Sequence, residues 1–320
     1  MSSDAAPGQN SIGTRKRQNL VAIAELSTEQ ICDLIDQALM IKQDYKLGRR
    51  PPLLQGRILG MLFEKPSLRT RVSFEVGMYQ LGGHAMYLSP QEVELGRRES
   101  VPDAARVLSR YVDAIVIRTF GHDRVQELAR HASIPVINGL SDLEHPCQAL
   151  ADILTIREHR GTLPGVRLTY IGDGNNVCNS LALAATKLGL RMTIACPRGY
   201  EPPEAIVHMA LEAAHHTGGQ LHISHDPREA VRGADVVYTD VWTSMGQERE
   251  SAQRRADFAG FQLNRALLNV AGDAVVMHCL PAHRGEEITD EVMESDDSIV
   301  FDQAENRVHA QKAVLCHLIR

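Results

Sequence analysis

Hydrophobic residues along the chain form short apolar runs that alternate with amphipathic stretches. Four runs in the first half have the length and composition of buried strands: ILGMLF (58–63), HAMYL (84–88), AIVI (114–117) and PVIN (135–138). The segments between them place apolar residues three and four positions apart, which is helical spacing. This alternation predicts the parallel strands and covering helices of an α/β fold.

Two stretches predict long helices. A capping box of Ser27 and Gln30 precedes apolar residues at helical spacing and predicts the start of the first helix. A second helix is predicted from His145 to His159, ended by Gly161. Beyond it, five more runs predict a second series of strands: RLTYIG (167–172), RMTIAC (191–196), QLHIS (220–224), DVVYT (235–239) and AVVMH (274–278).

The two series predict two domains. Residues 1–16 are a polar tail with little to bury, for which we expect disorder. We assign residues 17–145 to the first domain and 146–303 to the second. The expected fold class is α/β, with two Rossmann-like domains on parallel sheets and the active site in the cleft between them.

Composition narrows the classes of function. The chain has 320 residues and a formal net charge of -6. An acidic balance argues against a protein that coats nucleic acid, because displacing phosphate counterions needs a broad basic face. We find no apolar run of signal-peptide or membrane-span length, so we expect a cytoplasmic protein without a membrane partner.

The six cysteines are scattered, with no C-x-x-C pair. In a chain of this length the spacing fits neither a disulfide scaffold nor a zinc ribbon, and no metal or cofactor is expected. Five are expected to be buried thiols: Cys32, Cys147, Cys178, Cys196 and Cys316. Cys279 is different, because it ends a predicted strand just before Leu280 and Pro281.

Polar and ionisable residues crowd the carboxyl ends of the predicted strands. Ligands of open α/β sheets bind at those ends, so this clustering predicts a site between the two domains. The clusters cover residues 67–71, 118–119, 145–148, 173–176, 240–246 and 279–281.

The turn SLRTR, residues 67–71, is the most informative of these clusters. Ser67 is a good N-cap, and the backbone amides after it sit at the positive end of a helix, where a phosphate binds readily. Arg69 adds a bidentate fork and Thr70 a hydroxyl. The turn alone equally fits a capped helix with surface charges, but Arg118, at the end of a neighbouring strand, favours an anion site.

Four motifs in the same order resemble the transcarbamylases, and in particular their ornithine branch. FEKPSLRTR is similar to the Ser-Thr-Arg-Thr-Arg carbamoyl phosphate motif, and HPCQALAD to the His-Pro-x-Gln-x-Leu-Ala-Asp motif. HCLPAHRGEE resembles the His-Cys-Leu-Pro motif, and DVWTSMGQE the Ser-Met-Gly loop. The resemblance runs from about residue 18 to the C-terminus. It implies attack of the L-ornithine δ-amine on carbamoyl phosphate, giving L-citrulline and phosphate, by a homotrimer or a multiple of trimers.

The resemblance implies a carbamoyl phosphate site in the first domain. Ser67, the Leu68 backbone, Arg69 and Thr70 would hold the phosphate, and Arg118 would reach both the phosphate and the carbonyl oxygen. These donors meet the need of the reaction for a clamp on a doubly charged leaving group.

The family also implies contacts to the carbamoyl group. His145 would donate to the carbonyl oxygen, and Gln148, three residues later on the same helix face, would take the amide. Cys279 and the Leu280 carbonyl would position the attacking δ-amine beside that group. Arg307 matches a further contact, so the final helix, residues 304–320, should pack on the first domain.

The ornithine site is implied in the second domain. Asn176 and the Met245 amide would bind the α-carboxylate, and Asp240 and Ser244 the α-amino group. An acidic Asp240 suits a cationic amino acid better than aspartate as acceptor. The alternative, which its neighbours make the weaker one, is that Asp240 only caps the turn after its strand. Arg118, His145, Asp240 and Cys279 are the expected catalytic residues.

The chain departs from the family pattern at two positions. Leu68 stands where the motif usually has Thr, so a side-chain donor is lost while the backbone amide remains. Glu94 stands where relatives often carry Gln or His that reaches the neighbouring subunit. A carboxylate beside a phosphate is unfavourable unless Arg97 or Arg98 intervenes, which leaves the contact between subunits open.

Three other functions stay open. The loop at residues 172–177 mimics a dinucleotide fingerprint, but Val177 replaces the third Gly and no acidic residue follows the next strand, which argues against a nicotinamide oxidoreductase. A catalytically silent binding subunit would not need the complete set of motifs. A carbamoyltransferase for putrescine or another amine would not need Asn176 and the Ser-Met-Gly loop.

Overall fold

The computed structural model describes most of the chain. The predicted polar tail, residues 1–16, lies outside the described residues. The described ranges are 18–93, 95–96, 98–244 and 246–319.

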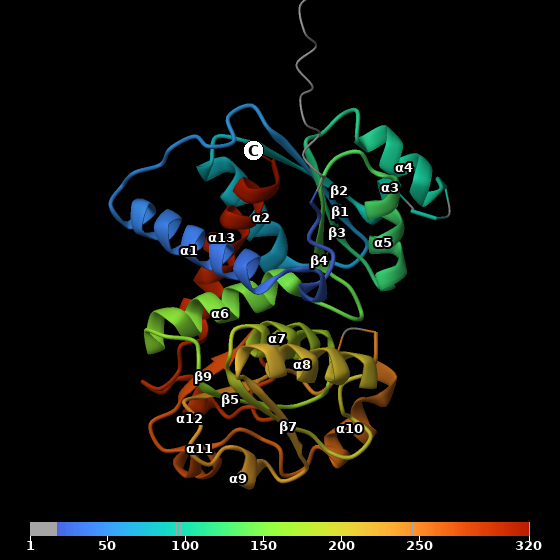
Figure 1. Ribbon diagram of the computed structural model, residues 1–320. Helices are drawn as coiled ribbons and strands as arrows, with labels where there is room; N and C mark the ends of the chain where they lie inside the picture. Colours follow the sequence, from blue (N-terminus) through green and yellow to red (C-terminus); the bar gives the residue numbers. More distant parts are fainter. Residues whose placement is uncertain (1–17, 94, 97, 245, 320) are drawn as a thin grey trace, which may run out of the picture.

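Two parallel sheets lie in opposite halves of the molecule, the first in the upper half of Figure 1 and the second in the lower half. The first sheet has the order β2-β1-β3-β4 and is built from β1 (Ile58–Phe63), β2 (His84–Leu88), β3 (Ala114–Arg118) and β4 (Val136–Leu140). The second has the order β7-β6-β5-β8-β9 and is built from β5 (Arg167–Ile171), β6 (Arg191–Ala195), β7 (Gln220–Ser224), β8 (Val236–Thr239) and β9 (Val275–His278). The predicted two-domain α/β class is confirmed.

The ends of several strands differ from the prediction by one or two residues. The run predicted at 135–138 forms β4 over 136–140, because its pairing with β3 continues past an irregularity to join Arg118 to Leu140. Pairing with a neighbour, rather than the apolar run itself, sets where a strand stops.

The prediction of a buried strand at residues 84–88 is wrong. β2 is the edge of its sheet and pairs with β1, and its residues are half-buried or exposed. β7, at the edge of the second sheet, has a similar pattern of burial. Strand order decides this burial, since an edge strand has one neighbour and less cover.

The first α-helix, α1 (Thr28–Lys46), begins with the predicted capping box. The Ser27 hydroxyl accepts a hydrogen bond from the Gln30 backbone amide, and the Gln30 side-chain oxygen accepts one from the Ser27 backbone amide. The helices of the first half are η1 (Ile23–Glu25), α1, α2 (Leu68–Gln80), α3 (Pro90–Val93), α4 (Val101–Leu108) and α5 (His122–His131).

The second half begins with the predicted long helix. α6 has His145 as its N-cap and ends at Gly161, which takes a left-handed conformation at φ 73°. The helices here are α6 (Pro146–Arg160), α7 (Asn176–Lys187), α8 (Glu204–Thr217), α9 (Pro227–Ala230), η2 (Glu248–Glu250), α10 (Ser251–Asp257), α11 (Arg265–Ala271), α12 (Asp290–Met293) and α13 (Val300–Ile319).

The last helix returns to the first half, as predicted. α13 packs against α1, α2 and α6, and Figure 1 shows it among the helices of the upper half. It begins at Val300 rather than at 304. α6 lies between the halves and packs on α13 and α7, so the predicted boundary between residues 145 and 146 stays a prediction.

Burial of the cysteines follows the prediction with one exception. Cys147, Cys178, Cys196 and Cys316 are buried, but Cys32 is exposed and the prediction for it is wrong. Cys32 lies on the outer face of α1, where the helical repeat turns it away from the apolar row.

None of the helices in the described ranges has the length and apolar character needed to cross a membrane.

Candidate active site

A cavity of about 740 Å³ opens between the two halves. Its lining comes from both sheets, at the loops that follow β1, β3, β5, β8 and β9. Met245 and Glu94 lie outside the described residues. Every other predicted site residue lines the cavity: Ser67, Leu68, Arg69, Thr70, Arg118, His145, Gln148, Asn176, Asp240, Ser244, Cys279, Leu280 and Arg307.

The first wall of the cavity begins at the N-terminus of α2. Ser67 caps this helix, since its hydroxyl accepts from the Thr70 amide at 3.2 Å. The first turn carries no acidic residue. The positive end of the helix dipole therefore faces the cavity without an internal counter-charge. Leu68 also borders the cavity, but its side chain is 74% exposed.

Three guanidinium groups meet at this helix end. Thr70 Oγ1 accepts from Arg118 Nη1 at 3.5 Å and from Arg307 Nη2 at 3.0 Å, which leaves the Thr70 hydroxyl proton for a ligand. Burial, with Arg307 and Arg69 nearby, lowers the pKa of Arg118 to about 10. Burial also lowers the pKa of Arg69 and that of Arg307.

Part of this cationic cluster lacks an internal partner. The Nε atoms of Arg118 and Arg307 are buried and have no hydrogen-bond partner among the described residues. Buried cations that repel one another and keep unused donors are costly unless an anion joins them. The first wall is therefore built for a ligand of high negative charge.

His145 stands at the junction of the two halves. Its backbone amide donates to Ser180 Oγ at 2.8 Å, which fixes the start of α6. Burial lowers the pKa of the His145 imidazole well below its usual value, and Arg307 and Arg118 lower it further. The ring is thus neutral, with one N–H to donate, and its Nδ1 has no hydrogen-bond partner in the described structure.

The second wall carries a carboxylate, Asp240. Its Oδ2 accepts from Asn175 Nδ2 at 2.8 Å, and its Oδ1 accepts from the Cys279 thiol at 3.0 Å. Burial and the neighbouring Asp240 hold the pKa of Cys279 well above its usual value. Cys279 is therefore a protonated hydrogen-bond donor, because the nucleophilic form of cysteine is the thiolate.

The loop after β9 holds an unusual backbone conformation. Leu280 has φ 56°, a left-handed value that a branched side chain rarely takes. Its amide donates to His278 Nδ1 at 2.9 Å, and His278 Nε2 lies 3.0 Å from Glu287 Oε1. Both ring nitrogens of His278 are thus used inside the protein.

Two groups of metal-ligating types occur among the described residues. Asp240, His278 and Cys279 form one of them beside the cavity. It suits a metal poorly, because the Leu280 amide and Glu287 occupy both His278 nitrogens. A solvent-side group of the same kind contains His283, Glu286 and Glu287.

Asn176 and Ser244 also line the second wall. Asn176 Nδ2 donates to the Ser141 carbonyl at 2.6 Å, a contact from the second half to the first. The Ser244 amide donates to Gln247 Oε1 at 3.1 Å, which folds the loop after β8 on itself.

Sequence reasoning missed two supports of this wall. Asn175 caps α7 and also holds Asp240, although it is the neighbour of the predicted Asn176. Arg254 donates to Asp173 Oδ2 at 2.8 Å and to the Trp242 carbonyl at 3.0 Å, which ties the loops after β5 and β8 together. Asn175 was detectable as a cap, whereas nothing in the surrounding sequence of α10 marks Arg254.

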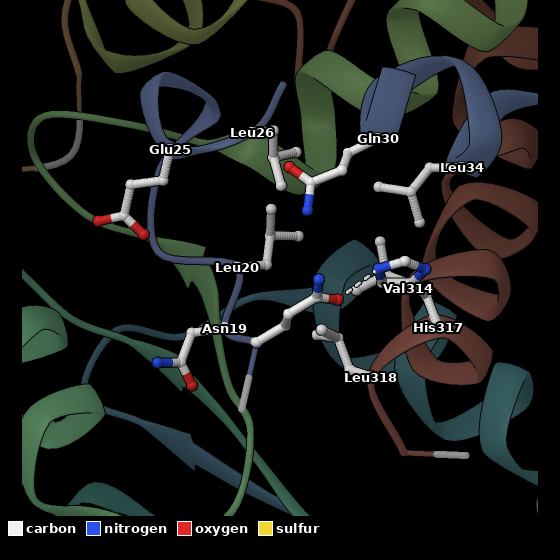
Figure 2. Close-up of a pocket in the computed structure, with 10 residues that line it drawn as sticks. Asn19, Leu20, Glu25, Leu26, Gln30, Leu34, Val314, His317 and Leu318 are labelled. Carbon is white, nitrogen blue, oxygen red and sulfur yellow. Dashed lines mark hydrogen bonds between the residues drawn. The ribbon is translucent and has the colours of Figure 1, made fainter. Parts of the chain in front are cut away.

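A second cavity, of about 360 Å³, lies between the N-terminal segment, α1 and α13. Figure 2 shows His317 at this cavity. The His317 Nε2 atom lies 2.8 Å from Gln18 Oε1, within hydrogen-bond distance. Of the predicted site residues that the structure describes, none lines this cavity.

The chain belongs to the aspartate/ornithine carbamoyltransferase family. The model of the family's carbamoyl-P binding domain matches residues 18–158, and that of its Asp/Orn binding domain matches residues 164–318. An ornithine carbamoyltransferase from Pyrococcus horikoshii is 53% identical over 305 residues, which cover 95% of this chain and 96% of that protein. An ornithine carbamoyltransferase from Anoxybacillus flavithermus is 54% identical over 305 residues, covering 95% and 97%.

A solved structure shares the fold. The ornithine carbamoyltransferase from Pyrococcus furiosus superposes with a TM-score of 0.93 at 53% sequence identity, over 94% of this chain and 97% of that one.

Proposed function

We propose that the protein transfers the carbamoyl group of carbamoyl phosphate to the δ-amine of L-ornithine, giving L-citrulline and phosphate. The main observation behind the proposal is that two walls of different chemistry face each other across one cavity. Three guanidinium groups meet at a capped helix end on one side, and a carboxylate with a protonated thiol stands on the other. Relatives at about 53% identity that bear this activity in their names support it.

The first wall would bind the phosphate. Ser67, the Leu68 backbone amide, Arg69 and Thr70 surround it, and Arg118 reaches from the phosphate to the carbonyl oxygen. The charge on the phosphate grows as the C–O bond breaks, so fixed cations stabilise the transition state more than the ground state.

His145 and Gln148 would hold the carbamoyl group. A neutral His145 donates one N–H to the carbonyl oxygen, where negative charge develops during attack. The Gln148 carbonyl oxygen accepts from the carbamoyl amide and also from Arg307 Nη1, which lies 2.5 Å away. These contacts fix the plane of the carbonyl relative to the incoming amine.

The second wall would bind ornithine. Asn176 and the Met245 amide take the α-carboxylate, and Asp240 with Ser244 takes the α-amino group. The Cys279 thiol and the Leu280 carbonyl orient the δ-amine, which must be neutral to attack. Its proton then passes to the departing phosphate, so the reaction needs no separate base.

We further propose a homotrimer whose contact includes the exposed face of α2. Leu68, Val72 and Tyr79 share that face, with Met86 of β2 also exposed nearby. An apolar stripe of this kind is typical of a protein interface. Light scattering tests it: Tyr79→Glu should reduce the mass from trimer to monomer, and an unchanged mass contradicts the assignment.

We also propose a cytoplasmic location, in keeping with the expectation from the sequence. Cell fractionation tests it, and recovery of the protein with membranes contradicts it.

An assay of the ureido product tests the central proposal. The protein is supplied with carbamoyl phosphate and, in turn, with ornithine, putrescine and aspartate. We expect turnover with ornithine that exceeds the other two by at least about 100-fold, because putrescine lacks the α-carboxylate and aspartate lacks the δ-amine. Equal turnover of putrescine would assign the protein to another amine acceptor.

A further inference from the structure

A chain of buried side chains runs beneath the cavity from the first wall to the second. We call Gln148, Asp152, Gln303 and His278 the buried polar chain. The first two belong to α6, Gln303 to α13, and His278 ends β9. All four are at most 1% exposed, so every contact among them is shielded from water.

Asp152 is the centre of this chain and accepts from three donors. Its Oδ1 accepts from Gln148 Nε2 at 2.8 Å and from Gln303 Nε2 at 2.7 Å, and its Oδ2 accepts from the Tyr238 hydroxyl at 3.2 Å. A carboxylate satisfies all three because it offers acceptors only. Burial raises the pKa of Asp152 to about 7, while the three donors favour its ionised form.

The first consequence concerns Gln148. Because its amide nitrogen faces Asp152, its oxygen must face Arg307, whose Nη1 lies 2.5 Å away, and the cavity. Turning this amide over would bring an NH₂ group against a guanidinium and leave Asp152 facing an oxygen. Asp152 therefore decides which Gln148 atom is presented to the carbamoyl group.

The second consequence concerns the loop after β9. Because the Gln303 nitrogen faces Asp152, its oxygen is free to accept from the His278 amide at 2.9 Å. His278 in turn accepts from the Leu280 amide and so helps to hold Leu280 in its left-handed conformation. The carbonyl of Leu280 is the group that the proposed function assigns to the δ-amine.

We propose that Asp152 is a positioning residue that sets both substrate subsites at once. Through Gln148 it orients the acceptor for the carbamoyl amide, and through Gln303 and His278 it orients the loop that receives the amine. The substrate names rest on the proposed function, but the coupling of the two walls does not.

Two variants separate the route through Gln148 from the route through Gln303 and His278. Asp152→Leu keeps a similar size but removes both acceptor oxygens, so neither glutamine nitrogen has the partner that fixes its orientation. We expect KM to rise about 10-fold or more for both substrates and kcat to fall. Gln303→Met removes the second route alone, and it should raise KM for the amine while KM for carbamoyl phosphate stays within about twofold.

Thr155→Val is the matched control. Thr155 lies one turn further along α6, is fully buried, and accepts from Asn306 of α13 at 2.9 Å, but it does not line the cavity. It should lower the melting temperature, as Asp152→Leu does, but leave both KM values unchanged.

Two outcomes would overturn the proposal. One is an Asp152→Leu enzyme with both KM values within about twofold of the original, and the other is a Thr155→Val enzyme whose two KM values rise about 10-fold or more. If Asp152→Leu does not fold, Gln303→Met decides through the split between its two KM values.

The test does not depend on the acceptor assignment. KM for the amine is measured with whichever amine the unaltered protein turns over. Calorimetric titration of Asp152→Leu and Gln303→Met with inorganic phosphate adds a readout without turnover. Phosphate contacts neither glutamine, so its Kd should stay within about threefold in both variants, and a larger loss would mean general damage to the first wall.

Discussion

The two walls of the cavity meet their hydrogen-bonding needs differently. The first wall gathers Arg69, Arg118 and Arg307, and leaves the Nε donors of Arg118 and Arg307 unused. In the second wall, Asp240 already accepts from Asn175 and Cys279. An anion therefore completes the first wall, whereas a cationic ligand must replace contacts that the second wall already has. The two subsites therefore differ in the unfavourable part of their binding free energy. Groups that are already in place and unpaired have fewer contacts to break when a ligand binds.

The largest expected effect comes from removing a cation of the first wall. Arg69→Ala should lower kcat/KM for carbamoyl phosphate by about 100- to 1,000-fold, because the phosphate loses a charged donor in both the ground and the transition state. Steady-state kinetics and calorimetric titration with phosphate measure it.

Arg71→Ala is the control for this change. Arg71 lies two residues further along α2, but pairs with Glu75 at 2.9 Å and stacks over Tyr87. It should change kcat/KM by less than about threefold, since exposed ion pairs contribute little. An Arg69→Ala enzyme with normal phosphate affinity would refute the anion clamp.

A smaller effect is expected from the second wall. Asp240→Ala should raise KM for ornithine by about 10- to 100-fold, because the cationic α-amino group loses its counter-charge. Phosphate affinity should stay within about threefold, since Asp240 lies on the opposite wall. Kinetics with each substrate varied in turn measure the split.

Asp240→Asn separates the effect of the charge from that of the side-chain size, because it keeps the size and removes the charge. Its KM for ornithine should lie between those of the original protein and Asp240→Ala. Equal loss of phosphate and ornithine affinity in Asp240→Ala would mean that the walls do not act separately.

The smallest expected effect is a pH dependence of stability that comes from Asp152, which lies beneath the two walls of the cavity. The folded-state pKa of Asp152 is raised from 3.8 to about 7, so the folded protein binds a proton that the unfolded chain releases in this range. Stability from this group is therefore fully present below about pH 4 and is lost as the pH rises through about 7.

Relative to Asp152→Asn, the original protein should thus lose about 2 kcal/mol of unfolding free energy between pH 5 and pH 7.5. Denaturant unfolding at several pH values measures the difference. If the free energy of unfolding of the original protein, relative to that of the variant, stays constant or rises over this range, the predicted direction is wrong.

Local features of the fold followed from the sequence. The capping box at Ser27 and the N-cap at Ser67 involve residues three apart, and both occur where predicted. Gln148 lies three residues after His145, and the two line the same cavity as the spacing requires. Burial of β2 could not be predicted, because an apolar run does not reveal whether its strand lies at the centre or the edge of a sheet.

Three features could be predicted from the sequence: the succession of strands and helices along the chain, the capped turn at Ser67, and the chemical types of the residues that line the cavity. Short-range spacing and side-chain chemistry control all three. Only the tertiary structure decided which of these residues meet. Thr70 and Arg307 are 237 positions apart, and Asp152 and Gln303 are 151 apart. Their contacts exist because α13 packs on both α2 and α6, and packing between distant helices leaves no periodic signal in the chain.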